Sequence, residues 1–136
     1  MVDSGVHQRL PATPASVPDL REAIRAYGER AGAGEQQLGA ISLTITEAAT
    51  NAVRHAYREG DVGAVDVDAH VAGRELIVRL RDYGAGLVTH SRARGRGLGL
   101  GLVLMERLAD ECVVESCDPG TQVTLRFRLD QPAERN

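Results

Sequence analysis

The spacing of apolar residues differs between segments of this chain, and that difference constrains the fold more than any other feature. Before Tyr57, apolar residues recur every three or four positions, which predicts amphipathic helices. From Val65 to Val71, and again from Gln122 to Arg128, they recur every second position, which predicts strands. The two helical stripes are Val17, Leu20, Ile24, Tyr27 and Ala31, and then Leu38, Ile41, Ile45, Ala48, Ala52 and Ala56. We predict a first helix with Ser16 as its N-cap, and a second from about Glu35 to Tyr57.

The second half of the chain is predicted to supply most of a sheet. Two alternating segments flank Gly73 and indicate a hairpin whose polar face, with Asp66 and Asp68, is solvated. The other expected elements are an edge strand at His7–Leu10, a helix at Leu98–Ala109 buried between layers, and strands at Cys112–Ser116 and Gln122–Arg128. This order predicts an α/β fold class, a two-layer α/β sandwich with helices on one face of a mixed, mostly antiparallel sheet.

Length and composition limit the classes of protein to consider. The 136 residues suit a single domain spanning 1–136, with flexible tails at about 1–6 and 130–136. No apolar run approaches the roughly 20 residues that span a bilayer, and no signal-peptide pattern begins the chain, so a cytoplasmic protein without a membrane partner is expected. A net charge of −3 and few aromatic residues argue against direct nucleic-acid binding.

Cysteine and lysine usage exclude further chemistry. Cys112 and Cys117 lie five apart on a predicted strand and point to opposite faces, so they are expected to be free thiols. The histidines lack the spacing of zinc ligands. All sixteen basic residues are arginine, so a triphosphate would have to be held by glycine backbone, a metal and arginine.

Glu47 and Asn51 lie four residues apart in the second predicted helix, which places their Cβ atoms about 5–6 Å apart on one face. Both side chains project from the edge of the apolar stripe, where packing can fix a side chain that still reaches a cleft. A carboxylate base beside a metal-ligating amide is one interpretation. Two polar residues flanking an amphipathic stripe is the other, and it is the simpler one for the pair alone.

Two glycine-containing segments follow downstream. Asp82 ends a predicted strand before Gly84 and Gly86, where a carboxylate could accept a hydrogen bond from a nucleobase amino group, although Asp followed by Gly is also common in turns. Glycines at 95, 97, 99 and 101 directly precede a helix, so free N–H groups and the helix dipole favour a phosphate there. A dinucleotide-binding fingerprint would need a buried strand before these glycines, and residues 89–94 do not form one.

Together these segments resemble the N, G1 and G2 boxes of the GHKL ATPase superfamily, which includes gyrase, histidine kinases and MutL. Within it the chain is most similar to the anti-sigma-factor serine kinases, and residues 43–57 (LTITEAATNAVRHAY) read like the N-box helix of that family. The resemblance extends from the first helix to the final strand. It implies the Bergerat ATP-binding fold.

The resemblance also implies a role for each matched residue. Glu47 would be the general base, and Asn51 would ligate Mg²⁺. Asp82 would bind the adenine amino group with support from Thr121. The base pocket and the phosphate cradle would be formed by Gly84, Gly86, Gly95, Gly97, Leu98, Gly99, Leu100 and Gly101. An arginine early in the first helix contacts the partner in this family, and Arg21 is the nearest match.

The implied function uses ATP and Mg²⁺ to phosphorylate a serine of an anti-anti-sigma antagonist of the STAS type, and includes sequestration of a sigma factor by a homodimer. Only eight residues, 87–94, separate Gly86 from Gly95, which is shorter than the usual ATP lid of the family. A nucleotide-binding regulatory module without kinase activity is therefore the alternative. A third class, the nucleotide-gated ATPase or dimerisation unit, would need a flanking domain.

Overall fold

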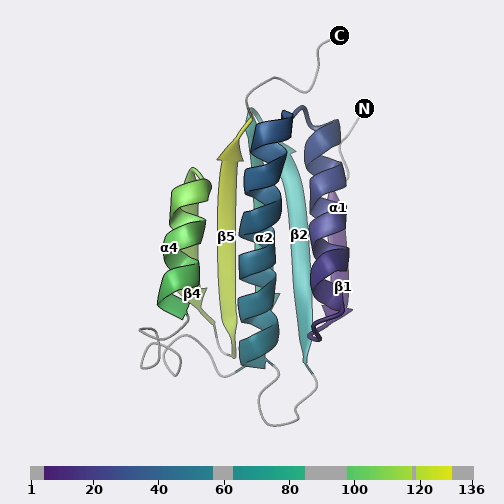
Figure 1. Ribbon diagram of the computed structural model, residues 1–136. Coiled ribbons are helices and arrows are strands. Elements are labelled where there is room, and N and C mark those ends of the chain that lie inside the picture. The colour runs from purple at the N-terminus through teal and green to yellow at the C-terminus, as the bar shows by residue number, and fades with distance from the viewer. Residues whose placement is uncertain (1–4, 57–62, 85–97, 118, 130–136) are drawn as a thin grey trace.

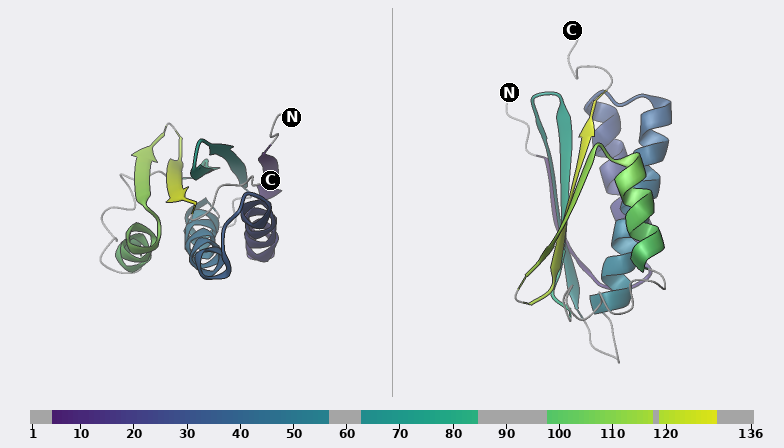
Figure 2. Two further views of the ribbon diagram at one scale, coloured as in Figure 1. Left: turned by 90° about the horizontal axis from the view of Figure 1, so that it is seen from above. Right: turned by 90° about the vertical axis from the view of Figure 1, so that its left-hand side faces the viewer.

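The computed structural model describes residues 5–56, 63–84, 98–117 and 119–129. The elements follow in the order β1 (Val6–Pro11), α1 (Ser16–Arg30), α2 (Glu35–Ala56), β2 (Ala64–Ala72), β3 (Glu75–Asp82), α4 (Leu98–Leu108), β4 (Glu111–Ser116) and β5 (Thr121–Arg128). The helices lie together on one face of the sheet, and the other face has no helix over it among the described residues (Figures 1 and 2). The two-layer α/β sandwich is therefore confirmed.

The strand order is β1-β2-β3-β5-β4, and every pairing in the described part of the chain is antiparallel. The expectation of a mixed sheet was wrong in this respect. Strands β3 and β4 run in the same direction, but β5 lies between them and pairs with both. Helix α4 connects β3 to β4, and direct pairing of these two strands would have been parallel. Because β5 lies between them, that parallel pairing does not form.

The core lies between the two layers, where the predicted helical stripes meet the apolar face of the sheet. Its members that are at most 1% exposed come from both layers and include Leu20, Ile24, Ile41, Ile45, Leu76, Val78, Leu125 and Phe127. The predicted hairpin is confirmed, with Gly73 at its tip in the left-handed region at φ +63°. The free thiols predicted at Cys112 and Cys117 are also confirmed.

Two helix predictions require correction. Ser16 is the first residue of α1, and Ala15 occupies the cap position; the Ser16 hydroxyl donates to the Pro11 carbonyl instead, at 2.6 Å, because the chain turns back sharply after β1. Helix α4 is not buried between layers. Met105 is 2% exposed whereas Val103 is 49% exposed, because the single helical layer leaves the outer side of α4 in contact with solvent.

None of the helices within the described ranges is both long enough and apolar enough to cross a bilayer.

Candidate functional site

Four elements converge at one end of the sandwich, the lower end in Figure 1. The C-terminal half of α2 ends there, α4 begins there, β3 ends there at Asp82 and β5 starts there at Thr121. Antiparallel pairing explains the last two positions, because Asp82 and Thr121 face each other directly in the β3–β5 ladder. The fold therefore gathers at one end segments that are far apart in the sequence.

Glu47 and Asn51 lie directly against the first turn of α4. A Cβ added to Gly101 would stand 2.7 Å from Glu47 Oε1 and 3.2 Å from Asn51 Nδ2. Real Cβ atoms almost never approach a neighbour that closely, so α4 reaches this position because residue 101 has no side chain. The structure thus brings together three of the residues selected from the sequence.

Asn51 is nearly buried, at 9% exposed, and its Nδ2 atom finds no hydrogen-bond partner among the described residues. An unpaired buried amide costs free energy, roughly 1–3 kcal/mol, so such a group is typically retained for a ligand or for function. Amide and carboxylate oxygens are also the protein ligands that Mg²⁺ prefers, usually one or two of them together with substrate phosphates. The pair of Glu47 and Asn51 fits that requirement.

Larger ligand sets do not occur in the described part of the chain. No group of three or more His, Cys, Asp or Glu side chains there is arranged to hold a metal ion. A protein-only metal centre is therefore not a feature of the described residues, and a cation at Asn51 would take further oxygens from a bound substrate.

Asp82 is 5% exposed at the end of β3, and Gly84 donates its N–H to Asp82 Oδ1 at 3.0 Å. This local turn orients the carboxylate. Gly120, just before β5, lies against the same backbone: a Cβ on Gly120 would stand 1.9 Å from the Asp82 carbonyl oxygen, and its φ is +100°. This role of Gly120 depends on a cross-strand approach that the sequence does not reveal.

Comparison with known proteins agrees with this geometry. The profile of the histidine kinase-like ATPase domain matches residues 10–127, from β1 to β5. The chain belongs to the histidine kinase-like ATPase family. The match covers all the elements that form this site.

Named relatives of this histidine kinase-like ATPase domain include the serine-protein kinases RsbW. The protein from Listeria innocua is 30% identical over 84 residues, which is 62% of this chain and 54% of the relative. The protein from Bacillus subtilis is 30% identical over 79 residues, covering 58% and 49% respectively. The chain therefore spans about half the length of the curated relatives it matches.

A solved structure supports the same fold. The RsbU and RsbW domains of Rv1364c from Mycobacterium tuberculosis superimpose with a TM-score of 0.73 and 26% sequence identity, covering 98% of this chain and 35% of that one. The RsbW-like, GHKL-like fold expected from the sequence is confirmed.

The remaining predicted glycines of this histidine kinase-like ATPase domain are only partly described. Gly86, Gly95 and Gly97 lie outside the described residues. The backbone of Leu98, Gly99 and Leu100 forms the first turn of α4, which carries no acidic residue. The free N–H groups and the positive end of the helix dipole therefore favour an anion at this turn.

Arg21 lies apart from these groups, on α1. Its Nη1 donates to Thr46 Oγ1 of α2 at 3.3 Å, and the side chain is half-buried. The guanidinium therefore links α1 to α2, and a role in partner binding stays a prediction.

Proposed function

We propose that this domain binds ATP with Mg²⁺ and acts as a serine-protein kinase. The observation that carries the proposal is the buried Nδ2 atom of Asn51, which has no hydrogen-bond partner among the described residues and lies, with the Glu47 carboxylate, against the first turn of α4. The similarity to the RsbW kinases supports the choice of reaction.

Asn51 is the residue proposed to hold the metal. Mg²⁺ would supply neutralisation of the triphosphate charge when bound. Since the chain contains no lysine, the start of α4 supplies the remaining positive potential through backbone N–H groups. Asp82 and Thr121 are proposed to receive the adenine ring at the other side of the site, with Gly84 leaving room for close approach.

Glu47 is proposed to act as the general base. It would take the proton of the substrate serine hydroxyl as the serine oxygen bonds to the γ-phosphorus, while the bond from that phosphorus to the oxygen bridging it to the β-phosphate breaks and ADP leaves. The Glu47 carboxylate lies near Asn51 and beside the first turn of α4, where residue 101 has no side chain. Positioning of this kind supplies much of the catalysis in phosphoryl transfer, because the transition state is loose.

The proposed partners are those that the resemblance to the anti-sigma-factor serine kinases implies. We propose a serine-containing antagonist of the anti-anti-sigma type as the phosphate acceptor, and a sigma factor as the sequestered partner of a homodimer. Arg21 is the proposed partner-binding residue.

The test is a transfer assay with γ-labelled ATP, Mg²⁺ and the candidate antagonist. The parent protein is expected to label a serine of the antagonist, and Glu47→Ala is expected to lower the rate by at least about a hundredfold. Glu22→Ala, on the exposed side of α1, is the matched control and should label at the parent rate. Equal labelling by Glu47→Ala would remove Glu47 from this role.

The second candidate function is nucleotide-dependent regulation without phosphoryl transfer. The eight residues between Gly86 and Gly95 favour it, because a short lid excludes water poorly. ATP binding without any labelling of the antagonist by the parent protein would select this function.

A further inference from the structure

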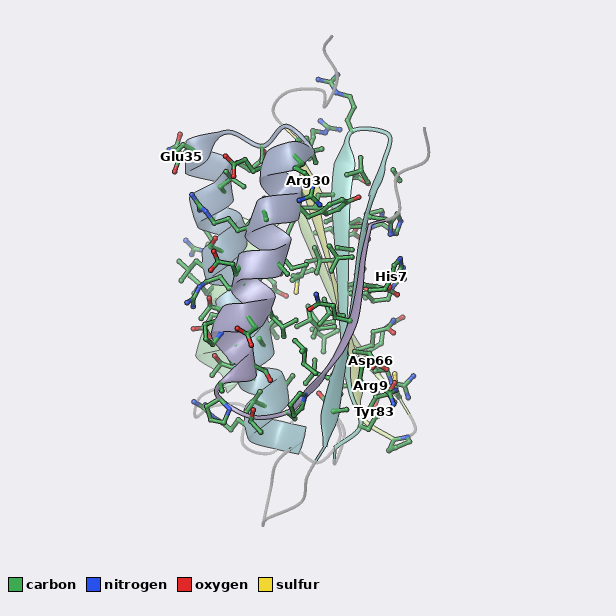
Figure 3. All side chains as sticks on the ribbon, turned by 90° about the vertical axis from the view of Figure 1, so that its right-hand side faces the viewer. His7, Arg9, Arg30, Glu35, Asp66 and Tyr83 are labelled. Atoms are coloured by element: carbon green, nitrogen blue, oxygen red, sulfur yellow. The ribbon has the colours of Figure 1, made fainter. Side chains whose placement is uncertain are left out.

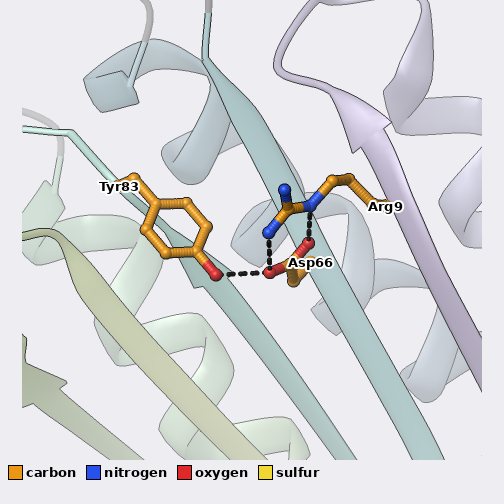
Figure 4. A network of polar contacts seen from close by, with 3 residues as sticks. All are labelled: Arg9, Asp66 and Tyr83. Atoms are coloured by element: carbon orange, nitrogen blue, oxygen red, sulfur yellow. Dashed lines mark hydrogen bonds and ion pairs between the residues drawn. The ribbon is translucent and has the colours of Figure 1, made fainter.

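Tyr83 lies between Asp82 and Gly84 and is held by residues from two other strands. Its hydroxyl donates to Asp66 Oδ2 of β2, and Asp66 also accepts two hydrogen bonds from Arg9 of β1 (Figure 4). The Arg9 bonds are 2.6 Å from Nε to Oδ1 and 2.8 Å from Nη2 to Oδ2. This arrangement, which we call the Arg9–Asp66–Tyr83 clamp, lies on the sheet face away from the helices (Figure 3).

The Tyr83 ring has additional support from cations. The guanidinium carbons of Arg9 and Arg81 lie 5.6 and 4.7 Å from the ring centroid, within cation–π range. Arg81 in turn donates from Nη2 to the Pro119 carbonyl at 3.1 Å, on the turn before β5. The ring is thus tied to β1, to β2 and, through Arg81, to the β4–β5 turn.

The clamp holds the chain just beyond the end of strand β3. Strand β3 ends at Asp82, so Tyr83 is the first residue that no strand pairing holds. Its Cα lies close under Gly120, where a Cβ would stand 2.8 Å away. Holding the Tyr83 side chain therefore fixes the direction in which the chain leaves Asp82, and with it the Gly84 N–H that bonds to the Asp82 carboxylate.

We propose that Tyr83 is a positioning residue for the nucleotide base, held by Asp66 and Arg9. The clamp keeps Asp82 and Gly84 in the geometry that receives the adenine ring, and so links edge strand β1 to the base pocket. This inference rests on the proposed function. It assigns a task to Asp66, which the sequence indicated only as part of a solvated strand face.

A neighbouring ion pair supplies the matched control. His7 of β1 and Asp68 of β2 pair on the same face, one row further from Asp82 than Arg9 and Asp66. Their side chains are 65% and 43% exposed, against 66% and 32% for Arg9 and Asp66. Asp68→Asn therefore weakens the same β1–β2 pairing and leaves the clamp intact.

The experiment measures binding of a fluorescent ADP analogue, and of ATP with Mg²⁺, to the full chain. Tyr83→Phe and Asp66→Asn are expected to weaken the binding of both nucleotides by the same factor, about three- to tenfold, because the clamp acts on the base and not on the phosphates. The double variant is expected to bind no more weakly than the weaker single variant, since both changes act on Tyr83 through its hydrogen bond to Asp66. Asp68→Asn should bind within twofold of the parent.

A second readout needs no nucleotide. Hydrogen exchange of the Gly84 amide in the free protein, followed by NMR, is expected to quicken in Tyr83→Phe and Asp66→Asn and to match the parent in Asp68→Asn. Parent-like nucleotide affinity in both clamp variants would overturn the proposal, as would equal losses in Asp68→Asn. Failure of the parent itself to bind either nucleotide at millimolar concentration would overturn the proposed function, so the two failures are distinguishable.

Discussion

Gly101 of α4 lies against Glu47 of α2 so closely that a Cβ at residue 101 would stand 2.7 Å from Glu47 Oε1. Helices usually pack with side chains between them, at interaxial distances of 8–10 Å. Here the missing side chain lets the backbone of α4 contact the two polar groups of α2 directly. The proposed catalytic pair thus depends on a glycine fifty residues away.

We predict that Gly101→Ala lowers the affinity for ATP with Mg²⁺ by at least about tenfold while changing the free energy of unfolding by less than about 1 kcal/mol. The added Cβ must displace the carboxylate end of Glu47, which is flexible, and alanine favours the helix by up to about 1 kcal/mol. Calorimetry and urea unfolding measure the two quantities. Gly39→Ala in α2, where a Cβ meets nothing within 4 Å, is the control and should leave binding unchanged. Parent-like ATP affinity in Gly101→Ala would contradict the prediction.

Gly120→Ala, unlike Gly101→Ala, should lower the free energy of unfolding by about 2 kcal/mol or more. Its Cβ would stand 1.9 Å from the Asp82 carbonyl oxygen, which is backbone and cannot move alone, and its φ of +100° disfavours any side chain. Gly73→Ala also has a positive φ, +63°, but meets nothing within 4 Å, so only the conformational cost of about 1–2 kcal/mol remains. Urea midpoints compare the two variants, and equal losses would show that the contact with Asp82 is unimportant.

Asn51→Ala should remove the effect of Mg²⁺ on nucleotide affinity. In the parent, we expect chelation of Mg²⁺ to weaken ATP binding by about tenfold or more, and in Asn51→Ala to have little effect. The free energy of unfolding should not fall, because Nδ2 makes no hydrogen bond with the described residues and its burial without a partner is itself unfavourable. The measurement is ATP titration with and without EDTA. A variant that keeps the full response to Mg²⁺ would show that another group holds the metal.

The Asp66 carboxylate should make the free energy of unfolding depend on pH in the acidic range. Hydrogen bonds from Arg9 lower the pKa of the Asp66 carboxyl from 3.8 to about 2, so its contribution is present above about pH 4 and is lost as the pH falls toward 2. The difference in free energy of unfolding between the parent and Asp66→Asn should therefore be constant above about pH 5 and shrink below pH 4. Its size should be about 1 kcal/mol or less, because water screens a pair whose carboxylate is 32% exposed.

The same difference should become nearly flat with pH in an Arg9→Gln background, where the main cause of the shift is absent. Urea unfolding at pH 3 and pH 6 measures the change. A difference that stays constant between these values in the parent background would contradict the prediction.

Much of the fold could be predicted because the buried residues follow simple periods. Leu38, Ile41 and Ile45 are at most 2% exposed, as their helical spacing predicted, and the alternation around Gly73 identified the hairpin. Glu47 and Asn51 were neighbours by helix geometry alone. Local spacing was sufficient for each of these features.

The errors and omissions concern relations between elements. The helix predicted at Leu98–Ala109 was expected to be buried between layers, but Val103 is exposed. The number of layers decides whether an apolar helix face is buried, and the spacing of residues does not reveal that number. Asp66 was interpreted as a solvated residue because its contact with Tyr83 depends on the register of β2 with β3. Gly101 was selected for phosphate contact, whereas its packing on α2 depends on tertiary approach.

The position of β1 in the sheet has a further consequence. Strand β1 lies at the edge of the sheet and pairs only with β2. On the sheet face away from the helices, the His7–Asp68 and Arg9–Asp66 pairs link the two strands. Strand β3, by contrast, is flanked on both sides and buries Leu76, Val78 and Leu80. Ionic strength weakens exposed charge pairs and spares aliphatic packing. Added salt should therefore loosen the attachment of β1 at the edge of the sheet and leave the interior strand β3 unaffected.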